Sequence, residues 1–374
     1  MILAINMNPA IDKVYAVDDY RVGKVFRPRA MTATAGGKGL NVARVAHLLG
    51  EQVTVTGMIG GSTGRRIEEE VRKAGLDSRF VPIGGESRIC INVMDEKNST
   101  STEILEPGPV VTAQESEAFL VRYGELLEEC DVVTASGSLP KGLPADFYAM
   151  LIRLAKKKGK KFILDTSGEF FRKGIMEKPY MIKPNMDELT GIGIQLAGTG
   201  VEPTGTGVKP AGIGVQPAGI GIKPVGIGVE PTGTEVHLPG NGPRKTGNVT
   251  QKGKTDNENG EMRMGDCMEA VRSFRAMGIG LPVVSLGKHG CIAALEDGVY
   301  HFTTPDVRVV NTVGSGDSFV AGCAVGLSRG LRPGDIIRLG MACGTANTQF
   351  FKTGWIEKDM VEKFLQTVGC TKIG

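Results

Sequence analysis

The chain has 374 residues, 41% hydrophobic and 23% charged, which places it among ordinary globular proteins with enough apolar side chains for a large core. Its 44 Lys and Arg against 41 Asp and Glu leave a formal net charge of +3, too small to indicate a nucleic-acid or anionic-membrane partner. No stretch approaches the ~18 apolar residues of a membrane-spanning helix, and residues 1–5 lack the basic region of a signal peptide, so we expect a cytoplasmic protein.

Short apolar runs alternate with helical patterns over residues 1–195 and 261–374. The runs that predict buried strands are 2–5, 53–59, 131–135, 162–165 and 283–286. Segments with helical spacing between them include 64–74, 145–157 and 317–327. Alternation of this kind predicts an α/β fold with a mostly parallel central sheet and helices on both of its faces.

The first glycine-rich turn is A-G-G-K-G-L-N-V-A-R at residues 35–44, which runs into a helix ending near Gly50. Its three glycines permit a close approach of the backbone to a ligand, Lys38 supplies a charge, and Asn41 follows at the expected helix start. This layout suits the recognition of a polyol. A simple turn between a strand and a helix would explain the same residues.

A second group of strands differs from the buried ones. Residues 87–94 and 102–105 alternate more like exposed antiparallel strands around the polar turn 95–101. With parts of 13–17 and 27–34 they predict a small sheet beside the main domain, drawn from about 12–34 and 86–106. Such a sheet could serve as a lid.

Residues 196–260 contain a seven-residue unit, G-x-G-V-x-P-x, that recurs from Gly198. The segment is rich in Gly and Pro and has no aromatic residue, so it offers too little apolar surface to offset the entropy of ordering. We expect a disordered low-complexity insertion in a single domain spanning 1–374. An expanded tandem duplication explains it most simply, and a spacer or interaction module is the functional alternative.

The second glycine-rich turn is N-T-V-G-S-G-D at residues 311–317, which follows a strand-like run at 307–310 and opens a helix. Its glycines let successive N–H groups converge at the positive end of the helix, which makes a site for an anion. An acidic residue beside such a site would repel a resting phosphate, so Asp317 fits a base that takes a proton from an attacking hydroxyl. A helix cap is the alternative role for Asp317.

Other site chemistries have no support in the sequence. The nearest match to a P-loop, at Gly253-Lys254-Thr255, has Asn248 where the first glycine is required, and no G-x-G-x-x-G fingerprint occurs. The four histidines suggest neither a catalytic triad nor a metal site. The seven cysteines are scattered without a C-x-x-C pair, which predicts reduced thiols in the core.

The two turns together resemble the two signatures of the ribokinase-like, phosphofructokinase-B (PfkB) family of carbohydrate kinases. The chain is similar to this family over nearly all residues outside the insertion, and most similar to its tagatose-6-phosphate kinases and 1-phosphofructokinases. The runs that carry the resemblance are NMNPAID (6–12), TAGGKGLN (34–41), TEILEPGP (102–109), SGSLPKGLP (136–144), IKPNMDEL (182–189) and VVSLG (283–287). The resemblance implies a three-layer α/β/α sandwich with a small β-sheet lid.

The implied activity is ATP-dependent phosphorylation of a ketohexose phosphate to the bisphosphate. Tagatose 6-phosphate is the leading substrate and fructose 1-phosphate the alternative, whereas a ribokinase or nucleoside kinase would have no need for Arg88. A non-catalytic sensor of sugar phosphates or nucleotides is the alternative from another class.

The resemblance also implies a role for each matching residue. Asp317 would be the catalytic base, with the backbone of Gly314, Ser315 and Gly316 stabilising the transferred charge. The sugar phosphate would be bound by Asp12, Gly37, Lys38, Asn41, Arg88 and Ser138. Arg27 would join from a neighbouring subunit, because lids in this family often pair in dimers.

The nucleotide site is implied in the same way. Lys183, Ser285 and Gly287 would contact the phosphates of ATP, and Gly344 and Asn347 would lie near the adenine. Asn185 and Glu188, from an N-x-x-E motif, would position Mg²⁺ through water, since this ion dehydrates reluctantly.

Overall fold

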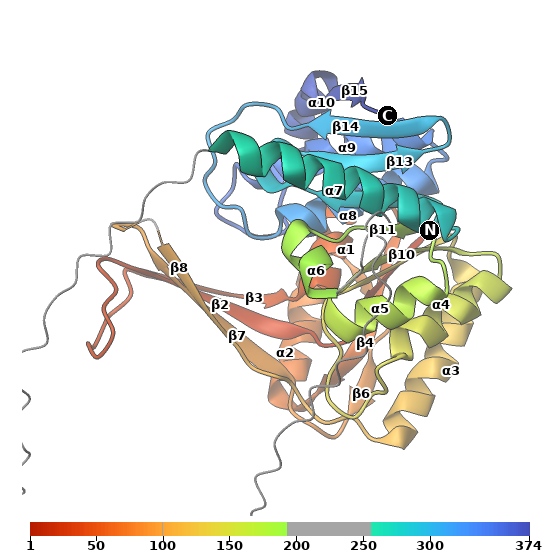
Figure 1. Cartoon of the computed structure of the whole chain (residues 1–374). Coiled ribbons are helices and arrows are strands. Elements are labelled where there is room, and N and C mark those ends of the chain that lie inside the picture. Colours follow the sequence, from red (N-terminus) through yellow and green to blue (C-terminus); the bar gives the residue numbers. More distant parts are fainter. Residues whose placement is uncertain (99, 193–255) are drawn as a thin grey trace, which may run out of the picture. The chain divides into compact units, whose positions relative to one another are not determined.

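The computed structural model describes residues 1–98, 100–192 and 256–374 (Figure 1). Most of the predicted insertion at 196–260 lies outside these residues, so its disorder stays a prediction. Among the described residues, no helix combines the length and the apolar character that a bilayer crossing requires.

A central sheet of mostly parallel strands organises the described chain (Figure 1). Its strand order is β15-β14-β13-β12-β11-β10-β9-β1-β4-β5, and β6 pairs with β4. The strands from β12 to β5 are parallel, whereas β13, β14 and β15 add an antiparallel edge. Their bounds are β1 Ile2–Asn6, β4 Val53–Gly60, β5 Asp77–Ser78, β6 Val81–Ile83, β9 Val132–Ser136, β10 Lys161–Asp165, β11 Met181–Ile182, β12 Leu281–Ser285, β13 Cys291–Leu295, β14 Gly298–Thr303 and β15 Gly369–Lys372.

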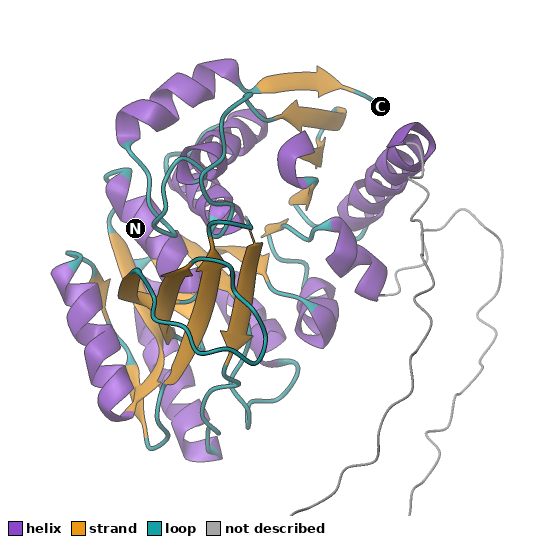
Figure 2. Ribbon diagram, turned by 90° about the vertical axis from the view of Figure 1, so that its left-hand side faces the viewer, coloured by secondary structure: helices purple, strands orange, loops and turns teal. Residues whose placement is uncertain are grey.

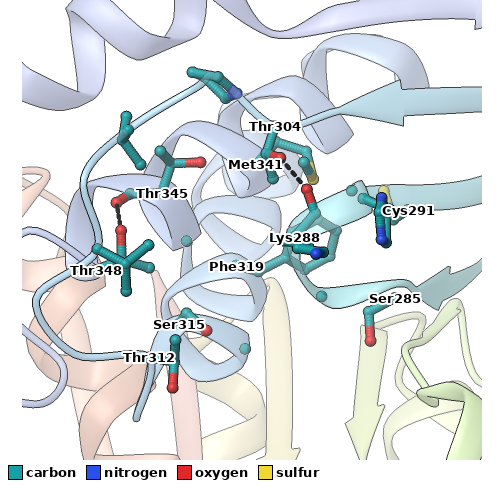
Figure 3. A pocket seen from close by; sticks show the side chains of 18 of the residues that line it. Ser285, Lys288, Cys291, Thr304, Thr312, Ser315, Phe319, Met341, Thr345 and Thr348 are labelled. Atoms are coloured by element: carbon teal, nitrogen blue, oxygen red, sulfur yellow. Dashed lines mark hydrogen bonds between the residues drawn. The ribbon is translucent and has the colours of Figure 1, made fainter. Parts of the chain in front are cut away.

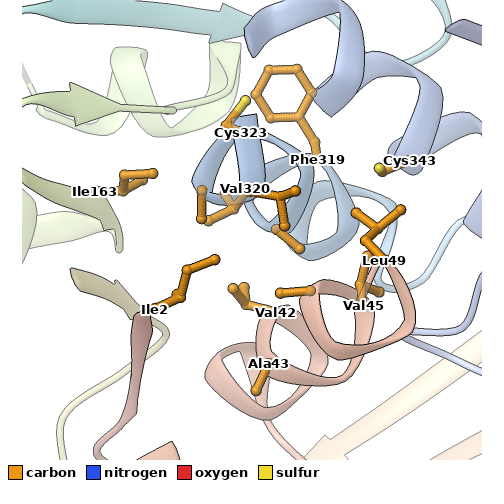
Figure 4. Close-up of a cluster of buried hydrophobic side chains, with 14 of the residues drawn as sticks. Ile2, Val42, Ala43, Val45, Leu49, Ile163, Phe319, Val320, Cys323 and Cys343 are labelled. Carbon is orange, nitrogen blue, oxygen red and sulfur yellow. The ribbon is translucent and has the colours of Figure 1, made fainter. Parts of the chain in front are cut away.

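The central strands carry buried apolar side chains on both faces of the sheet. Their sequences are therefore continuous hydrophobic runs. On β1, Ile2 and Ala4 join one buried cluster while Leu3 and Ile5 join the other. The first cluster lies under α1 Lys38–Leu48, α2 Gly61–Lys73, α8 Ser315–Ser328, α9 Pro333–Asn347 and α10 Lys358–Thr367. The second lies under α3 Ala113–Glu129, α4 Phe147–Lys157, α5 Gly168–Met176 and α7 Asp256–Ala276. Figure 4 shows Val42 and Val45 of α1 opposite Phe319 and Val320 of α8 in the first cluster.

A separate four-stranded sheet extends from the main body, as predicted (Figures 1 and 2). Its strands are β2 Ala10–Val17, β3 Ala30–Gly36, β7 Arg88–Asp95 and β8 Thr100–Leu105, in the order β3-β2-β7-β8. The β7–β8 hairpin is antiparallel, whereas β2 and β7 run parallel. We call this sheet the lid sheet.

The strand predicted at 307–310 is wrong. These residues form an irregular segment between β14 and α8, with Val309 and Val310 each 52% exposed. The backbone N–H groups of Val310 and Asn311 donate to the carbonyl of Thr348 at the end of α9, rather than to a strand. The β-branched residues therefore satisfied the sequence pattern of a strand without having a partner in a sheet.

Candidate active site

The two glycine-rich turns meet at one place. Nδ2 of Asn41, on α1, donates a hydrogen bond of 2.8 Å to Oδ2 of Asp317, on α8, across 276 residues of sequence. Both side chains are buried, at 5% and 7% exposure. The packing of α1 against α8 in the first apolar cluster holds them together (Figure 4).

Asp317 is the third residue of α8, and Gly314 is the N-cap. Gly314 has φ 84, and a Cβ there would lie 2.6 Å from Cγ2 of Thr353 and 3.0 Å from Oδ1 of Asn347, so glycine is required at this turn. No side chain caps the helix. Asp317 is therefore not a helix cap, and its carboxylate is directed elsewhere.

The pKa of Asp317 is raised to about 6, mainly by burial and in part by the negative charge of the neighbouring Asp165. Lys38, the hydrogen bond from Asn41 and Lys183 oppose this shift in the pKa. A carboxyl group with a pKa near the operating pH can both accept and release a proton, which is the property that a general base needs.

Asp165, at the end of β10, is a site residue that the sequence reasoning missed. Its Oδ1 lies 3.2 Å from Nζ of Lys183, and the two side chains are only 2% and 8% exposed. Asp165 is also the main reason why the pKa of Lys38 is raised. A carboxylate that ends a buried apolar strand was the available signal, because the carboxyl ends of parallel strands are where ligands bind.

Asp12, on β2, is a second, partly buried carboxylate of the site. Burial raises its pKa to about 6, while Arg88, a hydrogen bond from the Gly37 N–H and Arg44 oppose this. A Cβ at Gly36 would overlap the Asp12 carboxylate, and one at Gly37, where φ is 107, would lie 2.5 Å from Nδ2 of Asn6. Both glycines are therefore needed to bring the turn against these side chains.

Arg88 lies where the lid sheet joins the main body. Its Nε donates to the carbonyl of Asn8 and its Nη1 to the carbonyl of Glu106. Nδ2 of Asn8 in turn donates to the carbonyl of Pro107 and to Oγ of Ser138. The predicted residues Asp12, Arg88 and Ser138 thus belong to one connected region, whereas Arg27 lies in the exposed loop between β2 and β3.

A cavity of about 580 Å³ opens beside the N-terminus of α8 (Figure 3). Phe319 and Met341 give it apolar walls, and Lys183 reaches it from the side of Asp165. Six of the predicted residues line it: Lys183, Ser285, Gly287, Ser315, Gly316 and Gly344. A mostly apolar hollow at a helix N-terminus, with Lys183 and Lys288 in its lining, has the size and chemistry for a nucleotide.

Two predicted roles differ in the structure: that of Asn347 near the adenine and that of the Ser315 N–H in stabilising the transferred charge. Asn347 is fully buried and does not line the cavity; its Nδ2 donates to the carbonyls of Lys352 and Trp355, which fixes the loop after α9. The N–H of Ser315 donates to the carbonyl of Thr312 within the turn. The predicted donors Gly314 and Gly316 keep N–H groups with no acceptor among the described residues, and so does Asp317.

Asn185 and Glu188 hold each other at the start of α6 Met186–Ile192. Oδ1 of Asn185 accepts from the N–H of Glu188, and Oε2 of Glu188 accepts from the N–H of Asn185. Among the described residues, no cluster of three or more His, Cys, Asp or Glu could form a direct metal cage. Two fixed oxygen-bearing side chains fit a Mg²⁺ ion that keeps most of its water.

Comparison with known proteins points to one family. The model of the "pfkB family carbohydrate kinase" matches residues 4–195 and 257–356, and so omits the repeat. A tagatose-6-phosphate kinase from Staphylococcus epidermidis is 33% identical over 370 residues, covering 98% of each chain. A possible 1-phosphofructokinase from Thermotoga maritima has the same fold with a TM-score of 0.74, at 23% identity and full coverage of both chains. The tetrameric inhibited form of phosphofructokinase-2 from Escherichia coli matches with a TM-score of 0.70, at 21% identity and 98% coverage of both.

Proposed function

The chain belongs to the PfkB family of carbohydrate kinases, and we propose that it transfers the γ-phosphoryl group of ATP to a ketohexose phosphate, tagatose 6-phosphate in the first place. The observation that carries this proposal is the buried Asp317 carboxylate at the start of α8, which accepts a hydrogen bond from Asn41 of the first glycine-rich turn and directly follows Ser315 and Gly316 of the cavity lining. The name of the S. epidermidis relative supports the choice of sugar. Seven cysteines present as thiols support a cytoplasmic location.

In the proposed reaction, Asp317 accepts the proton of a primary sugar hydroxyl as that oxygen attacks the phosphoryl group. The N–H groups of Gly316 and Asp317 and the ammonium of Lys183 stabilise the negative charge that develops on the phosphoryl oxygens. Asp165 holds Lys183 in place through their buried ion pair. When bound near Asn185 and Glu188, Mg²⁺ would neutralise charge on the triphosphate.

We propose that Arg88 and Lys38 bind the phosphate already present on the sugar, with Asp12 and Asn41 on its hydroxyls. Arg88 and Lys38 are cations, and a guanidinium suits a phosphate because it can donate two parallel hydrogen bonds. The position of Arg88 at the base of the lid sheet would let sugar binding draw the lid towards the main body.

Replacing Arg88 by Ala is expected to raise KM for tagatose 6-phosphate by about 10- to 100-fold, because a charge-assisted contact to phosphate is lost. KM for ATP, and the weak turnover of unphosphorylated tagatose, should stay within about twofold. Arg88→Lys keeps the charge but loses the paired donors of the guanidinium, so its KM for tagatose 6-phosphate should lie between those of the wild type and Arg88→Ala. A coupled assay of ADP release over a panel of phosphorylated and unphosphorylated ketohexoses, including fructose 1-phosphate, measures these values.

An equal loss with phosphorylated and unphosphorylated sugars would contradict the role of Arg88. If the wild-type enzyme preferred fructose 1-phosphate or an unphosphorylated sugar in the same panel, the proposed substrate would be wrong. Arg122→Ala is a suitable control, because Arg122 is an exposed arginine of α3 that pairs only with Glu125 among the described residues.

We also propose that two copies of the chain pair through their lid sheets. Strand register puts Met31, Tyr15 and Val93 in one row and Ile91 and Ile104 in another on the same face, opposite the face of Asp12. Met31 and Ile104 are 57% and 56% exposed. A second apolar sheet of the same kind is a fitting cover for this face, and it would bring Arg27 towards the neighbouring sugar site.

Replacing Ile104 by Asp is therefore expected to give a monomer in sedimentation velocity, because a charge on the apolar face opposes pairing. KM for the sugar phosphate should rise with the loss of the dimer, while KM for ATP should not. Val121→Asp, which puts the same charge in place of an exposed apolar residue of α3, is the control. If the wild-type chain sediments as a monomer, the proposed pairing through the lid sheets is wrong.

A further inference from the structure

Arg44 is a partly buried arginine of α1 that no proposed step has used so far. Its Nη1 donates to Oδ1 of Asn41 over 3.1 Å and to the carbonyl of Thr353 over 3.2 Å, and its Nη2 donates to the carbonyl of Ala35 over 2.7 Å. It thereby joins the helix of Asn41 to β3, an edge strand of the lid sheet, and to the loop that follows α9.

The contact with Asn41 has a chemical consequence. An amide carries an acceptor at Oδ1 and two donors at Nδ2, whereas a guanidinium can only donate. With Oδ1 held by Arg44, the NH₂ group of Asn41 must face Oδ2 of Asp317, where the 2.8 Å hydrogen bond is found. A flipped amide would set its oxygen against the carboxylate and its NH₂ against the guanidinium, and both contacts would be repulsive.

We propose that Arg44 is a positioning residue, which holds the Asn41 amide in the single orientation that donates to Asp317 and so keeps this carboxylate aimed and ionised. The proposal deepens the proposed function, because it rests on Asp317 being the base of the kinase reaction. Arg44 does not touch the reacting atoms; it acts through Asn41.

The loop after α9 packs against the contact between Arg44 and Asn41. Gly354 has φ 62, and a Cβ there would lie 2.8 Å from Oδ1 of Asn41 and 3.0 Å from Nη1 of Arg44. The loop therefore packs directly on the contact between the two side chains and leaves no room for another arrangement. Arg44 also donates a hydrogen bond to the carbonyl of Ala35. Ala35 directly precedes Gly36 and Gly37, which lie against Asp12.

Other charged groups lie around Asp317 and around Arg44. Lys38, Asp165 and Lys183 act on Asp317 in addition to Asn41. Arg44 acts on Asp12 and on Lys352, and Glu70 lies in the same small hollow. Because none of the first three contacts Arg44, a change at Arg44 reaches Asp317 through Asn41.

The test is a titration of the Asp317 carboxyl by NMR on selectively ¹³C-labelled protein, assigned by its absence in Asp317→Asn. Arg44→Met is expected to raise the pKa of Asp317 by about one unit, since a hydrogen bond to the charged form is lost. In an Asn41→Leu background, the same Arg44→Met change should add no further rise in this pKa. The acid limb of kcat against pH should move by the same amount, with KM for ATP unchanged.

Arg329→Met is the matched control. Arg329 also joins α8 to the end of α1, through Glu51 and the carbonyl of Leu49, but at the far ends of the two helices. This variant should lose stability without any change in the pKa of Asp317 or in the pH profile. If Arg44→Met does not fold, Arg44→Lys, which keeps one donor group, should show a smaller rise that again depends on Asn41.

The inference is overturned if the pKa of Asp317 is unchanged by the Arg44 variants, or rises equally with and without Asn41. The titration needs no turnover, so its outcome is independent of the proposed function. A chain that phosphorylates no sugar phosphate, yet shows the Asn41-dependent shift, would refute the kinase substrate and keep the role of Arg44.

Discussion

Replacing Asp317 by Asn is expected to lower kcat by about 10³-fold, because the attacking hydroxyl loses the group that takes its proton. KM for ATP and for the sugar phosphate should change by less than about threefold, since Asn is similar in size and its carbonyl can accept the hydrogen bond from Asn41. Steady-state assays of ADP release give the rate, and equilibrium binding of a nucleotide gives the affinity without turnover.

The control for this variant is Asp335→Asn. Asp335 is the third residue of α9, as Asp317 is the third residue of α8, but it is a surface carboxylate that pairs with Arg332. This variant should keep its full activity. If Asp317→Asn turned over at near the wild-type rate, Asp317 would not be the base.

The pH profile adds an independent mark of the same group. Asp317 must be ionised to act, and its pKa in the free enzyme is raised to about 6, so kcat/KM for the sugar should fall as the pH drops through this value and level off above it. The pKa of Asp12 is raised to about 6 as well, so this fall should approach the slope expected for the uptake of two protons. In Asp317→Asn the fall should keep only the slope of one proton.

The central sheet could be predicted from the sequence because local signals agreed with the fold. The strands predicted at 2–5, 53–59, 131–135, 162–165 and 283–286 correspond to β1, β4, β9, β10 and β12 within one or two residues. Each of these is buried on both faces, and its apolar side chains must therefore be continuous. The run at 307–310 carries the same signal without a sheet partner, which no local pattern reveals.

The two glycine-rich turns and Asp317 could likewise be predicted from the sequence, because glycines at the start of a helix form a distinctive local pattern. Asp165 and Arg44 could not be assigned in this way. The role of Arg44 depends on a hydrogen bond to the carbonyl of Thr353, 309 residues further along the chain. The role of Asp165 depends on an ion pair with Lys183, which directly follows β11. Asn347 shows the converse: it follows the small residues that line the cavity, but its own side chain turns into the protein.

Replacing Gly36 by Ala is expected to lower kcat/KM for the sugar phosphate by about 10²-fold or more, although only one methyl group is added. That methyl would overlap the Asp12 carboxylate, so Asp12 must leave its position or the turn must move. Overpacking of this kind costs about 1 to 3 kcal/mol of stability, which a large domain should survive. Affinity for ATP should be nearly unchanged, because the clash lies on the side of the sugar site.

Because the added methyl acts on one side chain, the effect can be traced to it. In an Asp12→Ala background, Gly36→Ala should cause little further loss, since the space once filled by the carboxylate is now vacant. Gly124→Ala serves as the control, because nothing lies within 4 Å of a Cβ at this position in α3; it should leave activity intact. Losses that simply add in the double variant would mean that Gly36 matters for folding of the turn and that the Asp12 carboxylate is not what it protects.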